Sequence, residues 1–191
     1  DLDYAIVDLP MFYNGAEEDD TVIEDILESF ESITVVGFED PEDDQRDDDK
    51  INAPKELVGL VVREQTEAKL IANVYKDGRT KLDGIQLAVD DDGDVDLDNV
   101  IVKGAVDAIE DIEKDDVVVS YLAKDKSKVE LVVSRDTVEG KVTRTDGDGY
   151  ANIGGTKYDI NAVSVLKNDF AVELGEKGVF FLDHNGKIVA S

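Results

Sequence analysis

Short apolar runs separated by glycine-containing turns are the feature that most constrains the fold of this 191-residue chain. From residue 56 onward, runs rich in Val, Ile and Leu extend for only a few residues each. Turn signals such as Asp146–Gly147, Gly154–Gly155 and Asn185–Gly186 lie between them. Short strands with turn signals every ~8–12 residues are typical of small barrels and sandwiches. We therefore predict a mainly β fold made of small β-barrel or sandwich modules.

The expected strands are defined by their apolar runs. They cover residues 3–8, 34–38, 57–63, 68–75, 84–89, 100–102, 117–122, 129–133, 137–143, 150–153, 156–160, 179–182 and 187–190. Asp77–Gly78 predicts a hairpin turn within residues 76–79, because this pair supplies the positive φ that a type I′ turn requires. Asn14–Gly15 is a further turn signal. The valine-rich runs 117–122 and 129–133 are expected to form a hairpin around the polar turn of residues 124–127.

The segment of residues 17–32 departs from the strand pattern. Val22, Ile23, Ile26, Leu27 and Phe30 fall at helical spacing, so we expect one short helix over residues 21–32. A shorter helical or turn segment is expected over residues 106–112. Residues 39–50, EDPEDDQRDDDK, contain no apolar side chain. This composition predicts a solvated acidic loop inserted between folded segments.

We expect two modules that divide near residues 134–137. Residues 1–134 would form a β-rich module with the helix and the acidic insertion, and residues 135–191 a compact β-barrel-like module. Residues 112–132 and 174–190 share an order of charged turn, strand, tight turn and strand, which indicates either tandem modules or two ordinary hairpins. Strand alternation predicts the core of the second module as Val138, Val142, Ile153, Tyr158, Ile160, Val179, Phe181 and Ile188.

The charge of the chain excludes several classes of partner. Acidic residues number 47 against 20 basic ones, which gives a formal net charge of −27. Such a surface repels nucleic acid and anionic membrane faces, and no apolar run is long enough to insert into a membrane. Two interpretations of the charge stay open. One is adaptation to high salt, and the other is an exposed polyanionic surface that binds divalent cations.

The sequence offers little for catalysis. It contains no Cys, no Trp and a single His, His184, which lies in the turn sequence DHNG. We expect His184 to be a surface turn residue, because no nucleophile motif accompanies it. Nucleotide-binding glycine motifs are also absent. A carboxylate pair of a glycan-acting enzyme would need aromatic side chains to hold sugars, and aromatic residues make up only 6%. We predict no catalytic residue, no cofactor-binding residue and no required cofactor.

One acidic cluster is a weak candidate for calcium. The segment of residues 90–99, DDDGDVDLDN, alternates carboxylates, and Ca²⁺ prefers six to eight oxygen ligands. An EF-hand does not fit, because Gly93 at loop position 6 puts Ala88 and Asn99 where acidic residues are needed. A solvated acidic turn between strands is the alternative interpretation. The candidate ligands are Asp90, Asp92, Asp94, Asp96 and Asp98.

Three segments near the C-terminus resemble a known family. They read TVEGKVT (137–143), GTKYDI (155–160) and GEKGVFFLDHNGKIV (175–189). Together they resemble β-rich modules of Gram-positive S-layer-type surface proteins, which carry S-layer homology domains. The sequence DYAIV (3–7) resembles the strand that opens the next such module. The resemblance covers residues 137–190 well, residues 1–8 and 100–135 more loosely, and does not extend over residues 17–50.

The resemblance implies a location and a role. It implies a secreted, extracellular protein of the cell wall and cell surface, in which this chain is a non-catalytic structural or spacer segment. The implied partners are neighbouring modules of the same longer chain or other surface proteins. Two alternatives stay open: an extracellular glycan-acting enzyme domain, and an adhesion module that binds a partner protein through an exposed apolar patch.

Overall fold

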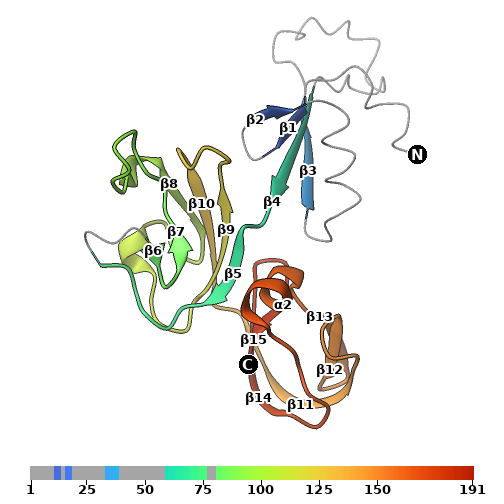
Figure 1. Cartoon of the computed structure of the whole chain (residues 1–191). Coiled ribbons are helices and arrows are strands. Elements are labelled where there is room, and N and C mark those ends of the chain that lie inside the picture. Colours follow the sequence, from blue (N-terminus) through green and yellow to red (C-terminus); the bar gives the residue numbers. More distant parts are fainter. Residues whose placement is uncertain (1–10, 14–15, 19–32, 39–58, 77–80) are drawn as a thin grey trace, which may run out of the picture. The chain divides into compact units, whose positions relative to one another are not determined.

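The computed structural model describes residues 11–13, 16–18, 33–38, 59–76 and 81–191. The chain divides into two compact units, Asp1–Glu64 and Gln65–Ser191. The described residues contain fifteen short strands, one α-helix and two 3₁₀ turns, so the predicted mainly β class is confirmed. Figure 1 shows these elements.

The first unit contains one described sheet, in the order β2-β1-β4-β3. Its strands are β1 (Met11–Tyr13), β2 (Ala16–Glu18), β3 (Ile33–Phe38) and β4 (Gly59–Glu64). The last two confirm the strands expected over residues 34–38 and 57–63. The expected strand 3–8, the Asn14–Gly15 turn, the helix 21–32 and the acidic loop 39–50 lie outside the described residues.

The second unit begins with a four-stranded sheet in the order β5-β9-β10-β8. The hairpin of β9 and β10 forms its centre, as predicted, while β8 pairs parallel to β10 and β5 pairs antiparallel to β9. The sheet contains β5 (Glu67–Leu70), β8 (Val100–Gly104), β9 (Val117–Leu122) and β10 (Val129–Ser134). Beside it lie β6 (Lys81–Leu82), β7 (Ile85–Gln86) and the 3₁₀ turns η1 (Leu97–Asn99) and η2 (Ile109–Asp111).

The second sheet of this unit curls into a half-barrel in the order β13-β12-β11-β14-β15. A single bridge between Ile160 and Ile188 connects its two edges. Its strands are β11 (Thr137–Thr145), β12 (Tyr150–Ile153), β13 (Thr156–Asp159), β14 (Lys177–Leu182) and β15 (Ile188–Ala190). The turns predicted at Gly154–Gly155 and Asn185–Gly186 contain the positive φ angles that favour glycine.

The predicted core of the half-barrel is correct except on β14. Val142, Ile153, Ile160 and Ile188 are buried, and Val138 and Tyr158 pack partly buried beside them. Val179 was predicted inside but is 41% exposed, and Phe180 is fully buried instead. Residues 179–182 are all apolar, so alternation could not identify the inward face of this strand. Phe181 packs against a different apolar cluster.

The segment of residues 67–86 differs from the sequence-based expectation in three respects. Strand β5 is shorter than the expected 68–75 and pairs with β9, and β7 is shorter than the expected 84–89. The hairpin in this region turns at Asp83–Gly84 between β6 and β7, with φ of 44° and 93°. The turn expected at residues 76–79 lies mostly outside the described residues.

A short helix, α2 (Ala162–Asn168), follows the half-barrel strand β13. Its N-cap is Asn161, whose side chain accepts hydrogen bonds from the N–H groups of Val163 and Ser164. Asp169 ends the helix in the left-handed conformation. Sequence periodicity did not predict α2, because a seven-residue helix is too short for a periodic signal. The 3₁₀ turn η2, by contrast, confirms the turn expected over residues 106–112.

An apolar cluster joins the two sheets of the second unit. Ala68, Val117 and Val119 come from the first sheet, whereas Val163 lies on α2 and Val189 on β15. The division expected near residues 134–137 falls between β10 and β11, so this cluster contains residues from both sides of it. Among the described residues, no helix is long and apolar enough to cross a membrane.

Candidate functional site

A network of buried, hydrogen-bonded polar side chains lies beside the apolar cluster. The Nδ2 amide of Asn161 donates to Gln65 Oε1 at 3.0 Å and to Asp183 Oδ2 at 2.8 Å. Gln65 Nε2 lies 3.4 Å from the hydroxyl of Tyr121 on β9. Burying an unpaired polar group is costly. These contacts therefore fix the sheet of β5, β9, β10 and β8, the N-cap of α2 and the β14–β15 turn in one arrangement.

The carboxylate of Asp183 is the charged group in this polar network. Asp183 is fully buried, and its Oδ1 accepts from the backbone N–H groups of Asn185 and Lys187 at 2.8 and 2.9 Å. With the Asn161 amide on Oδ2, three N–H donors surround the group. This set of donors satisfies a buried carboxylate and makes it a structural anchor of the turn.

The helix α2 also covers the free edge of β5. Ser164 Oγ and Asn168 Nδ2 both donate to the carbonyl oxygen of Ala68, at 3.0 and 2.9 Å. β5 is the last strand on its side of the sheet, and an uncovered edge invites pairing with another chain. We call the apolar cluster, the polar network and these two hydrogen bonds the junction. The junction covers one exposed sheet edge and also joins the two sheets.

An ion pair lies at the end of β10. Arg135 Nε donates to Asp116 Oδ1 at 2.7 Å, and its Nη2 donates to Asp116 Oδ2 at 3.1 Å. The pKa of Arg135 is raised above its ordinary value, chiefly by the hydrogen bond to Asp116 and also by the charge of Asp116. Nη2 further donates to the carbonyl oxygen of Asp111 at 3.1 Å, so Arg135 links β10 to the segment that precedes β9.

His184 occupies the β14–β15 turn, as predicted, and its side chain is exposed. Its Nε2 lies 3.2 Å from the Nδ2 of Asn185. No hydrogen bond joins His184 to a carboxylate or a hydroxyl among the described residues. The prediction of a surface turn histidine is confirmed.

The acidic cluster of residues 90–98 uses its carboxylates to hold turns. Asp90 Oδ1 accepts from the backbone N–H groups of Asp92 and Asp94, at 3.0 and 2.9 Å. Asp96 Oδ1 accepts from the N–H of Asp98 at 3.0 Å, and its Oδ2 accepts from an Asn99 amide. No group of three acidic or His side chains among the described residues is placed to hold a metal ion. Calcium binding here stays a prediction.

Salt should raise the melting temperature, because a net charge of −27 opposes compactness at low ionic strength. The Debye length falls from about 30 Å at 0.01 M to about 3 Å at 1 M. Melting followed against NaCl, then against CaCl₂ at matched ionic strength, separates screening from specific binding. An extra rise with CaCl₂ that Asp90→Asn with Asp94→Asn abolishes would indicate a calcium site. A flat response to both salts would contradict the role assigned to the charge.

One exposed carboxyl makes a testable contribution to stability. The backbone N–H of Tyr150, and that of Gly149 as a second donor, hold the pKa of Asp146 below its ordinary value of 3.8. A lowered folded-state pKa stabilises above the unfolded value, and this stability is lost as the pH falls through the folded value. Asp146→Asn should therefore lower the melting temperature at neutral pH, with the difference from wild type shrinking below about pH 4. Asp148→Asn is the control. A difference that did not change with pH would contradict the assignment.

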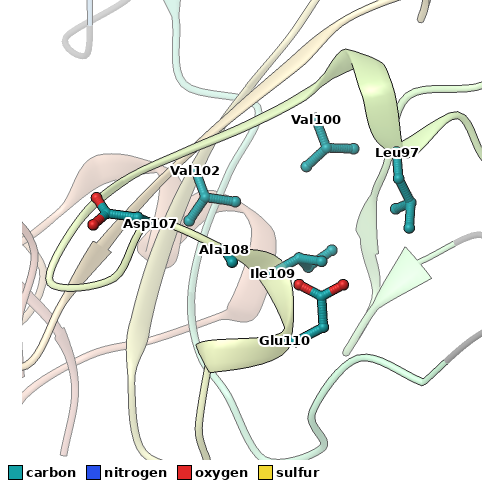
Figure 2. Close-up of a pocket in the computed structure, with 7 residues that line it drawn as sticks. All are labelled: Leu97, Val100, Val102, Asp107, Ala108, Ile109 and Glu110. Atoms are coloured by element: carbon teal, nitrogen blue, oxygen red, sulfur yellow. The ribbon is translucent and has the colours of Figure 1, made fainter.

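A groove lies between β8 and the segment that leads into η2 (Figure 2). Its volume is about 210 Å³, less than the ~300 Å³ at which pockets for small-molecule ligands begin. Val100 and Val102 lie on β8 across from Ile109 (Figure 2). The lining residues are Leu97, Val100, Val102, Asp107, Ala108, Ile109 and Glu110.

Sequence reasoning missed both the junction and the groove. Gln65, Asn161 and Asp183 are far apart in the sequence, and their meeting depends on the packing of two sheets. A local signal existed only for Asn161, a favourable N-cap residue before an apolar run. The groove has no signal of its own, because Val100 and Val102 read as an ordinary buried strand.

No protein-family model, curated protein or solved structure matches the chain.

Proposed function

We propose that this chain is a non-catalytic structural or spacer segment of a secreted, highly acidic S-layer-type cell-surface protein. The observation that supports this role is the junction inside Gln65–Ser191. Two β-sheets are joined there by an apolar cluster and by the polar network of Gln65, Asn161 and Asp183. A spacer must keep a constant geometry between its ends, and buried polar groups that are hydrogen-bonded to one another favour one arrangement.

The charge suits the same role. A surface with a net charge of −27 stays soluble and resists nonspecific association with other acidic polymers. In this proposal the partners are neighbouring modules of the same longer chain or other surface proteins. The sequence resemblance of residues 137–190 supports the S-layer-type assignment.

Labelling of intact cells tests the proposal. An antibody raised against residues 65–191 should label unpermeabilised cells of the source organism, and protease added outside should remove the signal. Labelling that appears only after permeabilisation would contradict a cell-surface location. The purified chain should release no reducing sugar from cell-wall polysaccharide. Steady release by the purified chain would favour the glycan-acting enzyme domain instead.

A further inference from the structure

We propose that the outer edge of β8, together with the adjoining groove, binds an extended segment of a partner protein. The segment pairs with β8 as an added strand, places an apolar side chain in the groove and carries Lys or Arg beside it. This interaction goes beyond the spacer role and does not depend on it.

The backbone of β8 is open on one side. β8 is the edge strand of its sheet, and the N–H of Ala105 donates to Val133 of β10 at 2.9 Å. Because backbone groups alternate along a strand, Val102 directs its N–H and C=O away from β10. No hydrogen bond between described residues outside the strand pairings reaches these groups. The opposite edge, at β5, is covered by Ser164 and Asn168, so β8 is the edge left for strand addition.

The groove provides an apolar pocket beside this open backbone. Val100, Val102 and Ile109 form apolar walls, and Leu97 is 38% exposed at one side. A volume of about 210 Å³ accommodates one or two aliphatic side chains rather than a cofactor. Strand addition combines main-chain hydrogen bonds with pockets for alternate side chains, and both parts are present here.

The charges select a basic segment. Asp107 and Glu110 line the groove with exposed side chains, and neither makes an ion pair within the described part of the chain. The nearest basic residue of the strand, Lys103, is held by Glu130 at 2.8 Å. A second copy of this chain would bring another net charge of −27 to the same surface. Like charges that meet at an interface disfavour that partner, whereas Lys or Arg is attracted.

Fluorescence anisotropy of the full chain with a labelled peptide tests the proposal. The probe is acetyl-KVKIKVK-amide, and its acidic counterpart EVEIEVE should not bind. Asp107→Lys with Glu110→Lys should weaken binding of the basic probe by about tenfold or more, since two attractive contacts become repulsive. The matched control is Glu139→Lys with Asp148→Lys, which changes the net charge equally on exposed residues of the half-barrel and should retain affinity. Equal weakening in both double variants would reduce the interaction to nonspecific attraction and overturn the proposal.

Two further variants separate groove and strand pairing from charge. Ala108→Phe fills the groove without changing the charge, and it should also weaken binding, while circular dichroism checks that the fold is retained. N-methylation of alternate peptide amides gives two probes, one blocked on each edge. Only one of them should lose affinity, because an added strand bonds β8 through one edge. Equal binding of both probes, or a dimer of this chain that the groove variants dissociate, would overturn the proposal.

Discussion

Asp183→Ala should lower the free energy of unfolding by about 3 kcal/mol. The change removes the acceptor of three N–H groups, from Asn161, Asn185 and Lys187. Each buried donor without an acceptor costs about 1–3 kcal/mol, and water reaching the exposed turn recovers part of this. Urea denaturation followed by circular dichroism gives the value from the midpoint and the slope.

Two variants make this result specific. Asp183→Asn keeps an acceptor oxygen for the turn but directs an amide donor toward Asn161. It should therefore lower the free energy of unfolding by less than Asp183→Ala does. Asp148→Ala removes an exposed carboxylate and should change the stability by less than about 0.5 kcal/mol. If Asp183→Ala changed the free energy of unfolding no more than Asp148→Ala, the buried polar network would not stabilise the fold.

Gly104→Ala should be about as destabilising, at roughly 3 kcal/mol. Gly104 ends β8 with a φ of 99°, and an added Cβ would lie 2.2 Å from the carbonyl oxygen of Val133. No rotation of a side chain relieves this contact, because the atom it meets is backbone. The strand β8 or its pairing with β10 must therefore shift, which urea denaturation would detect as a lower midpoint.

Gly147→Ala is the matched control. Gly147 has a similar φ of 106°, but an added Cβ meets no atom within 4 Å. It should cost only the backbone strain of about 1 kcal/mol. The difference between the two variants isolates the contact with Val133. Equal losses would mean that conformational strain alone determines the effect.

Local patterns predicted the parts of the fold that depend on neighbours in the sequence. The β9–β10 hairpin was predicted because two valine-rich runs flank a short polar turn. The side chains of β14 were assigned to the wrong face because the strand is apolar on both faces, with Phe180 in one cluster and Phe181 against another. The parallel pairing of β8 with β10 depends on non-local packing that periodicity does not encode.

The candidate sites show the same limit. The cluster of residues 90–98 was conspicuous in the sequence, but Asp90 and Asp96 hold turns there. The junction of Gln65, Asn161 and Asp183 consists of residues that are individually unremarkable in the sequence. These residues stabilise the structure because they are buried and contact one another across distant segments, and only the fold brings those segments together.

The two sheets of the compact unit Gln65–Ser191 should open as one cooperative structural unit, and native-state hydrogen exchange of the full chain tests this most directly. The slowest amides of β10 and β14 should exchange with the same opening free energy in the wild type. In Asp183→Ala, both should lose about a hundredfold of protection, the equivalent of about 3 kcal/mol. If β14 lost protection while β10 kept it, the sheets would open independently, and the account of a single structural unit would be contradicted.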